Sequence, residues 1–402
     1  MRTGAARLTG AALVGLVSIA AAGWSLASQI EEEGLTAGRR AWQIAPLPEN
    51  LLPASSPLPP ELPALSTSER RAIGRGLWRE PLEPRLFNLL FADSVRIGRP
   101  DRETDRLAAL LAQLGWRYTP AQQNLMIRAL LDERFGDVLD RVDALLRRQR
   151  QPALAYTVLA ALEGIPQIHG EVLDKLLAEP AWRSDYLSVI GPESAPALLE
   201  ARVRTIDALL KTRSGMNREE IAPSLIALNA SGRGRIAHGL WVRQAGEPAD
   251  ANLVHDPVFE QVAAQAGTAG PGIPFEWRLG QDLGYAAQTS SLGVSISWDR
   301  RGVPAFLSQT VPVRPGRDYV LTVQGRASDD SLQRLLSPLL LCATRAIRFE
   351  PAGEARQGQP RWRTGPLPAS CDMGVLTLNG ALDTGSGTVT IDLERVSLQF
   401  VS

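Results

Sequence analysis

The spacing of apolar residues changes once along the chain, near residue 250. Before that point apolar residues recur three and four positions apart, as in residues 107–114, which is the pattern of an amphipathic helix. Beyond it apolar and polar residues alternate, as in residues 294–298, and glycine and proline separate the runs. Strict alternation is typical of half-buried strands. The pattern predicts a multidomain chain, with an all-α domain over residues 67–249 and an all-β sandwich over residues 250–402.

Signals for helix starts and stops divide the first of these domains into short helices. Asn217 followed by Glu220 has the spacing of a capping box. Thr119 before Pro120 is also typical of a helix start, with Thr119 as the capping residue and Gln122 completing a capping box. Glycine and proline recur between the periodic stretches, which predicts helices of roughly 12–18 residues joined by short turns.

One stretch of the helical domain carries a family resemblance. Residues 107–152 contain Leu114-Gly115-Trp116, then Phe135-Gly136-Asp137, and then Ala144-Leu145. The stretch resembles the helical-hairpin repeats of the tetratricopeptide-like class, and the resemblance implies a domain that binds other envelope proteins. The full consensus does not recur at a clean period of about 34 residues. An irregular helical bundle therefore remains open as the alternative.

The β region carries a second and more specific resemblance. Its motifs are Asn252 to Glu260, Pro274 to Trp277, a strand–turn–strand run from Gln309 to Val323 that is predicted to form a hairpin, and a closing strand from Ile391 to Leu398. Their order and content are similar to those of galactose-binding-like jelly rolls, a group that includes many carbohydrate-binding modules. The resemblance implies a jelly-roll sandwich of some eight strands, and it makes a polysaccharide the candidate ligand.

Composition and charge narrow the function classes. The 43 basic and 43 acidic side chains cancel, whereas a general nucleic-acid binder usually carries a basic excess. Three histidines and two cysteines leave little material for a metal site. The common catalytic signatures, such as Gly-x-Ser-x-Gly and His-Glu-x-x-His, are missing from the sequence. The sequence therefore predicts a protein that is not an enzyme, needs neither metal nor cofactor, and does not bind nucleic acid.

The N-terminal segment is typical of a targeting signal. Arg2 and Arg7 precede an uncharged stretch over residues 8–27, and three glutamates follow it at residues 31–33. Ser25-Leu26-Ala27 has the small-residue spacing of a cleavage site, but the stretch is also just long enough to span a bilayer. We interpret residues 1–28 as either a cleaved signal peptide or a membrane anchor. In both cases the chain is exported, either anchored in the inner membrane and facing the periplasm, or released into the periplasm.

Residues 29–66 form a predicted linker. Seven prolines lie between positions 46 and 63, and proline-rich segments favour extended, semi-rigid conformations. We expect this linker to hold the rest of the chain away from a membrane surface.

The two cysteines, Cys342 and Cys371, both lie in the β domain. In an exported chain a single cysteine pair favours a disulfide. Two buried free thiols are the alternative.

Aromatic residues beside charged ones are the candidate ligand-binding residues. Sugars pack on flat rings, and guanidinium groups bind carboxylates. Two clusters combine these side chains: Trp298, Asp299, Arg300 and Arg301, and then Arg361, Trp362 and Arg363. We expect at least one of them to bind an acidic polysaccharide, with the indole exposed for stacking.

These observations predict an exported, non-enzymatic accessory protein of a bacterial-type envelope. It would assist the assembly or export of a cell-surface polysaccharide through glycan and protein binding. One alternative is a protein-interaction scaffold in which the jelly roll is purely structural. A polysaccharide-modifying enzyme of unrecognised type is the third possibility.

Overall fold

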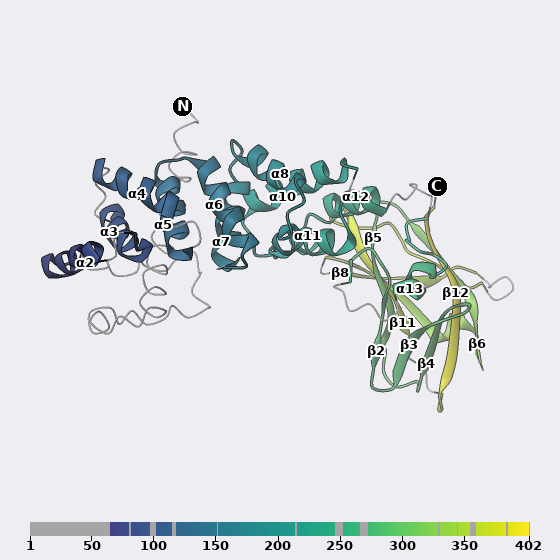
Figure 1. Ribbon diagram of the computed structural model, residues 1–402. Helices are drawn as coiled ribbons and strands as arrows, with labels where there is room; N and C mark the ends of the chain where they lie inside the picture. The colour runs from purple at the N-terminus through teal and green to yellow at the C-terminus, as the bar shows by residue number, and fades with distance from the viewer. Residues whose placement is uncertain are drawn as a thin grey trace. The chain divides into compact units, whose positions relative to one another are not determined.

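The computed structural model separates the chain into two compact units, Met1–Tyr186 and Leu187–Ser402 (Figure 1). It describes residues 65–79, 82–96, 102–114, 118–150, 152–213, 215–245, 252–265, 272–328, 330–343, 345–353, 359–382 and 385–401. The predicted signal or anchor over residues 1–28 lies outside these ranges, as does nearly all of the predicted linker. Of the helices that are described, none combines the length and apolarity needed to cross a bilayer.

The described part of the first unit is helical. Its helices are α2 (Thr67–Arg79), α3 (Pro84–Arg96), α4 (Arg102–Leu114), α5 (Thr119–Leu131), α6 (Phe135–Arg147), α7 (Pro152–Glu163), α8 (His169–Leu177) and α9 (Arg183–Ser188), the last of which runs across the division between the units. Three of them end in the same way, because Glu133, Gln149 and Glu179 each adopt a positive φ just after a helix. This left-handed turn satisfies the last helical carbonyls and reverses the chain. A helical array is therefore present, while the tetratricopeptide resemblance stays a prediction.

One predicted helix start is confirmed and one is wrong. The Asn217 side chain accepts from the backbone of Glu220 at 2.9 Å, and the Glu220 carboxylate accepts from the backbone of Asn217 at 3.1 Å. At α5 the capping position is Tyr118, which has no side-chain cap, and Thr119 is already helical. Gln122 does not complete a capping box there, because it is buried and its side-chain oxygen accepts from Arg141 of α6 at 2.7 Å.

The described part of the second unit joins three longer helices and two short ones to an antiparallel β-sandwich. The helices are α10 (Pro196–Leu210), α11 (Arg218–Ala230), α12 (Gly234–Ala245) and the short α13 (Glu260–Gln265) and α14 (Leu332–Leu335). Helical periodicity thus ends near the predicted position, but α10 to α12 group with the strands in one compact unit. The predicted domain boundary at residue 250 stays a prediction.

Two sheets make up the sandwich (Figure 1). One has the order β1-β5-β11-β7-β8 and the other β2-β3-β4-β12-β6-β10-β9. The strands are β1 (Arg278–Leu279), β2 (Gln281–Asp282), β3 (Tyr285–Ser290), β4 (Gly293–Trp298), β5 (Ala305–Pro312), β6 (Tyr319–Ala327), β7 (Leu336–Cys342), β8 (Arg345–Arg348), β9 (Glu350–Pro351), β10 (Arg361–Arg363), β11 (Met373–Gly380) and β12 (Val389–Phe400). The predicted combination of helices with an antiparallel β-sandwich is therefore present.

Two details of the predicted strands need correction. The run from Gln309 to Val323 is not a hairpin, because β5 and β6 belong to different sheets and the turn between them crosses the sandwich. The closing strand predicted from Ile391 to Leu398 is part of the longer strand β12, which has a register shift between Leu393 and Arg395. A bulge of this kind inserts one extra residue, which keeps the apolar side chains of both halves on the inner face.

The sandwich is held by an apolar core between the sheets and by a disulfide. Inward residues of β11 and β12, such as Leu376 and Ile391, are fully buried. Cys342 at the end of β7 is bonded to Cys371, just before β11, and their Cα atoms lie 5.2 Å apart. The predicted disulfide is confirmed, and it ties the end of β7 to the loop that leads into the central strand β11.

Helix α12 packs against one end of the sandwich. Trp241 lies edge-on to His255 with ring centroids 4.4 Å apart, and His238 lies edge-on to Phe275 at 5.2 Å. Arg235 donates to the carbonyl of Val313 at 2.6 Å. These contacts join the helix to the segments that precede β1 and follow β5.

Several motif residues that carried the jelly-roll resemblance have structural roles. The Gln309 side chain exchanges two hydrogen bonds with the backbone of His255, at 3.1 and 3.0 Å. The Asn252 side chain accepts from the backbone of Leu398 at 3.0 Å. The Trp277 indole donates to the carbonyl of Asp256 at 3.2 Å. The motif therefore fastens the first segment of the domain to the sheets.

Candidate functional site

The two indoles expected to stack on sugars lie in the core. Trp298 is 0% exposed and Trp362 is 2% exposed. The Trp298 ring lies 5.4 Å from that of Phe306 across the sandwich, and Trp362 pairs with inward-facing Leu321. The prediction that these rings stack on a ligand is wrong, because both occupy inward positions of their strands.

The structure also keeps the two predicted clusters apart. Trp298 pairs with Val389 at the start of β12, whereas Leu321, the partner of Trp362, pairs with Leu398 near its end. Nine residues of an extended strand span about 30 Å. The clusters therefore lie at opposite ends of the seven-stranded sheet and cannot form one compact site.

The residues after Trp298 form a closed turn. The Asp299 carboxylate accepts from the backbone of Arg301 at 3.0 Å and lies 3.7 Å from its guanidinium group. Arg300 adopts a positive φ of 64°, which suits the reversal of the chain between β4 and β5. Asp299 therefore stabilises a turn, and its carboxylate is engaged within the protein.

Arg361 and Arg363 lie on the outer face of the seven-stranded sheet. They flank the inward Trp362 and so point away from the core. Arg361 pairs with Thr322 of β6, which pairs in turn with Ser397 of β12. Arg363 is held by Asp318 at 2.6 Å. Three neighbouring strands thus place a guanidinium group and two hydroxyl groups in one row.

Sequence analysis missed a further member of this surface, Arg395. It pairs with Gln324 of β6, one row from Thr322, and Gln324 donates to Glu394 at 3.0 Å. Arg361 and Arg395 are both exposed and have no carboxylate partner among the described residues. We call the following set the outer arginine patch: Arg361, Arg363, Arg395, Thr322, Gln324, Ser397 and Gln399. The alternation of the sequence identifies the outward positions of β12. It does not give the strand register, which places these positions beside Arg361.

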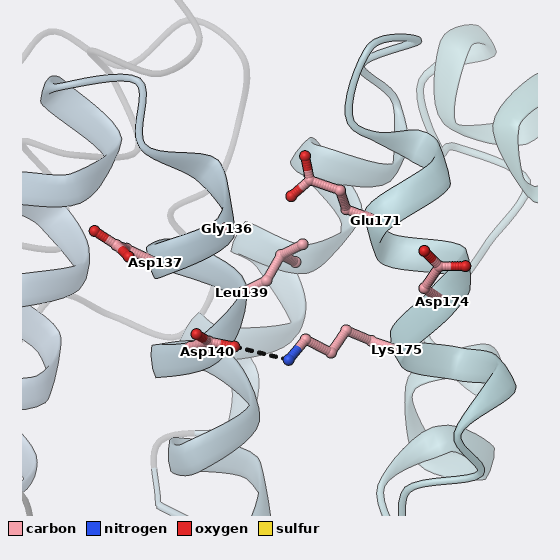
Figure 2. A pocket seen from close by; sticks show the side chains of 7 residues that line it. All are labelled: Gly136, Asp137, Leu139, Asp140, Glu171, Asp174 and Lys175. Atoms are coloured by element: carbon pink, nitrogen blue, oxygen red, sulfur yellow. Dashed lines mark hydrogen bonds and ion pairs between the residues drawn. The ribbon is translucent and has the colours of Figure 1, made fainter.

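The first unit contains a separate open pocket of about 380 Å³ between α6 and α8 (Figure 2). Four carboxylates line it, and Lys175 Nζ lies 2.7 Å from Asp140. The lining residues are Gly136, Asp137, Leu139, Asp140, Glu171, Asp174 and Lys175. The pocket is wide open and mainly acidic, which suits a solvated surface between two helices.

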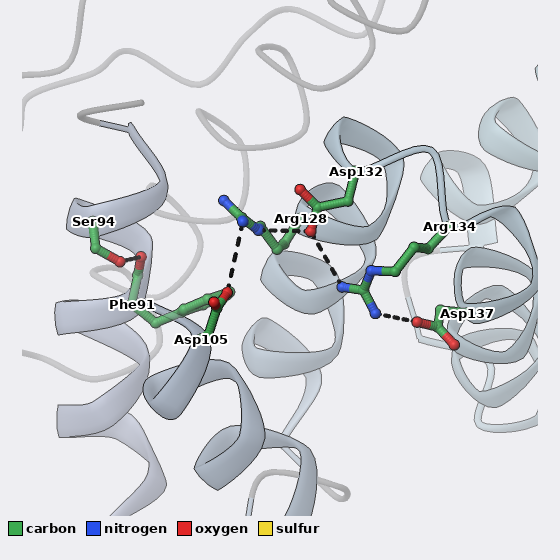
Figure 3. Close-up of polar contacts among 7 residues, drawn as sticks. All are labelled: Phe91, Ser94, Asp105, Arg128, Asp132, Arg134 and Asp137. Carbon is green, nitrogen blue, oxygen red and sulfur yellow. Dashed lines mark hydrogen bonds and ion pairs between the residues drawn. The ribbon is translucent and has the colours of Figure 1, made fainter. Parts of the chain in front are cut away.

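A chain of ion pairs runs across α4, α5 and α6 (Figure 3). Arg128 lies 2.9 Å from Asp132 and 3.8 Å from Asp105. Arg134 lies 3.4 Å from Asp132 and also pairs with Asp137 at the start of α6. Each carboxylate of this network forms an ion pair with a guanidinium group, and the pairs connect neighbouring helices. Their role is therefore structural, and none of these carboxylates is left as a candidate for catalysis.

The histidines show no catalytic pairing within the described residues. His238 is packed among aromatic rings, where burial lowers its pKa to about 4, with Arg235 and His255 adding to the effect. His255 Nε2 lies 2.8 Å from the Gln261 side chain. In the part of the chain that is described, no group of three His, Cys, Asp or Glu side chains is placed to bind a metal ion.

Comparisons with known proteins give no family. No protein-family model matches the chain, and no curated protein matches it. Solved structures that align with part of it include the enzymatically active domain of tailspike protein 4 of bacteriophage CBA120, at 12% identity and a TM-score of 0.21 over 31% of this chain. The alignment covers only 19% of that domain's own chain.

Another is TmCBM61 in complex with β-1,4-galactotriose, at 13% identity and a TM-score of 0.22, covering 37% of this chain and 100% of that one. Identities and TM-scores this low do not assign a family or a ligand to the chain.

Proposed function

We propose that the chain is a non-enzymatic accessory protein of the cell envelope whose sandwich binds an acidic polysaccharide through the outer arginine patch. The observation that carries this proposal is the row formed by Arg361, Thr322 and Ser397 on three adjacent strands. A guanidinium group beside hydroxyl groups offers fork-like recognition of carboxylates and hydrogen bonds to sugar hydroxyls.

The chemistry of the patch favours an anionic glycan over a neutral one. Of the three arginines on this surface, Arg363 is paired with Asp318 and lies opposite Glu350 of β9, while Glu394 is bonded to Gln324. The guanidinium groups available to an anion are therefore those of Arg361 and Arg395, which have no carboxylate partner in the described part of the chain. No aromatic ring lies in the patch, so binding rests on charge and hydrogen bonds and is expected to weaken as salt increases.

Affinity electrophoresis of the full chain through gels containing polygalacturonate tests the proposal. Arg361→Ala should reduce the retardation, because it removes a guanidinium group that has no carboxylate partner among the described residues. The matched control is Arg345→Ala, which removes an exposed arginine from β8 of the other sheet. If the Arg361 and Arg345 variants migrate alike, the patch is not the binding surface.

Export to the envelope belongs to the same proposal. It is supported by the charge pattern around residues 8–27 and by the disulfide, which is typical of proteins in oxidising compartments. Detection of the chain, with or without its N-terminal segment, in the periplasmic or the inner-membrane fraction of a Gram-negative host would support this part. Confinement to the cytoplasm would contradict it.

A protein-interaction scaffold is the second candidate function. The burial of Trp298 and Trp362 favours it, because it removes the aromatic platform on which sugar binding was first based. In this case the sandwich only supports the fold and the helical array binds a protein. The two functions differ in one result, since a scaffold would not be retarded by any polysaccharide.

A further inference from the structure

Helix α2 carries an indole that the fold does not use. Trp78 is 91% exposed, whereas the other described tryptophans, at positions 182, 241, 277, 298 and 362, are at most 6% exposed. The packed side of the helix lies elsewhere, because Ile73 is buried and a Cβ atom on Gly76 would lie 2.8 Å from Leu86 of α3. The helix is therefore already packed on α3 without the help of Trp78.

Two arginines share the exposed side of α2 with this indole. Arg71 and Arg75 lie seven and three positions before Trp78, and residues at these spacings lie on one face of a helix. Both arginines are exposed, and neither has a carboxylate partner among the described residues. Arg70 differs, because it is paired with Asp93 of α3 at 2.5 Å. We call Arg71, Arg75 and Trp78 the α2 face.

The one carboxylate of α2 is held away from this face. Glu69 is the only acidic residue of the helix. Its carboxylate accepts from the backbone of Ser66 at 2.7 Å, and the Ser66 hydroxyl accepts from the backbone of Glu69 at 3.2 Å. This capping box fixes the carboxylate at the start of the helix. Within α2, the α2 face therefore combines two positive charges and an indole without a negative charge.

This combination fits the surface of an anionic bilayer. Indoles prefer the membrane interface, because the ring is apolar while its N–H group can stay hydrated. Arginines lay their aliphatic stems on apolar surface and keep the guanidinium group in the polar layer, where it bonds to phosphate oxygens. A glycan would gain less, because it would meet one ring and two flexible side chains on a convex helix.

We propose that the α2 face binds the surface of a bilayer that contains anionic phospholipids. The Trp78 indole enters the interface, Arg71 and Arg75 contact headgroup phosphates, and the helix lies on the membrane without crossing it. Because α2 directly follows the predicted linker, the first unit then lies at the membrane and is not held away from it. This proposal is independent of glycan binding by the sandwich.

Quenching of tryptophan fluorescence by brominated phospholipids tests the contact in the full chain. The difference in quenching between the parent chain and Trp78→Phe isolates this indole from the other tryptophans. We expect a large difference with vesicles of brominated phosphatidylcholine and phosphatidylglycerol, and a much smaller one with brominated phosphatidylcholine alone. A membrane anchor over residues 8–27, if retained, tethers both chains equally and cancels in the difference.

The charge of the α2 face is tested with a pair of double variants. Arg71→Gln with Arg75→Gln should lower the ratio of docked to undocked helix roughly 30-fold, because each arginine near an anionic surface contributes a factor of about five. The extent of Trp78 quenching reports this ratio. The matched control is Arg102→Gln with Arg106→Gln, which removes two exposed arginines at the same spacing from α4 and should leave the quenching unchanged.

Three results would overturn the proposal. The first is Trp78 quenching that is equal in neutral and anionic vesicles, and the second is an equal effect of the two double variants. The third is a change of Trp78 emission with soluble polygalacturonate but not with vesicles, which would assign the α2 face to a glycan. The replaced side chains are exposed, so the variants should fold, and circular dichroism verifies that each keeps the helix content of the parent chain.

Discussion

At the scale of single residues, the direction of a side chain decides whether it can bind a ligand. Adjacent strand residues point to opposite faces, so Trp362 is buried while its neighbours Arg361 and Arg363 are exposed. A cluster in the sequence is therefore divided between the core and the surface. The stability effects of substitutions should divide in the same way.

Replacement of Trp298 by alanine should destabilise the sandwich strongly. It leaves a cavity in the core beside Phe306, and such large-to-small changes cost about 3–5 kcal/mol. Chemical unfolding of the variant and of the parent chain measures the loss. Arg361→Ala is the comparison, and it should change stability by less than about 0.5 kcal/mol. Equal losses in the two variants would contradict the burial of the indole.

His238 should make the second unit sensitive to acid. Its pKa is lowered from 6.5 to about 4, so the unfolded chain binds a proton first as the pH falls. The neutral His238 ring therefore makes its full contribution to the free energy of unfolding above pH 6.5. This contribution is lost as the pH falls from 6.5 to about 4. Because the ring is partly exposed, we expect a loss of roughly 1–3 kcal/mol.

The pH dependence has a direct control. His238→Phe keeps a ring beside Trp241 and Phe275 but removes the titrating group. Thermal unfolding of the parent and the variant, compared above pH 6.5 and near pH 4, should show a smaller acid shift in the variant. An identical shift would mean that another group is responsible.

At the scale of elements, covalent and capping interactions hold loops and helices in place. The disulfide closes a loop with a sequence separation of 29 residues. Chain entropy predicts that its removal costs roughly 3–4 kcal/mol. Cys342→Ser with Cys371→Ser should therefore lower the unfolding temperature of the second unit, and a chain that melts unchanged would contradict this estimate.

The sequence predicted which segments form strands and which side chains point inward, but it did not predict how the strands pair. Alternation in Val294 to Trp298 predicted β4, and it also placed Trp298 on the same face as buried Val294 and Ile296. Burial of this indole was therefore encoded in the alternation. What alternation does not contain is register, which alone places Arg395 of β12 one row from Arg361.

Helix ends show the same division between local and tertiary causes. The cap at Asn217 was predictable because all its partners lie within four residues. The start of α5 was not, because Gln122 binds Arg141, 19 residues away in the next helix. Local signals succeed where no distant side chain competes for the same groups.

At the scale of the whole molecule, the grouping of helices α10 to α12 with the strands makes a prediction about folding. A fragment beginning near residue 187 keeps the contacts of Trp241 with His255 and Phe275. A fragment beginning near residue 250 loses them and exposes these rings. We expect the longer fragment to unfold at the higher temperature. If the shorter one is equally stable, the boundary predicted at residue 250 also marks the independent folding unit.

Isothermal titration of the full chain with polygalacturonate tests the binding of an acidic polysaccharide most directly. We predict weak binding in the micromolar-to-millimolar range, roughly −4 to −8 kcal/mol, which weakens as salt is raised. Binding should be lost in Arg361→Ala with Arg395→Ala and kept in Arg345→Ala. No binding by the folded parent chain, or binding unchanged in the double variant, would contradict the assignment of the outer arginine patch.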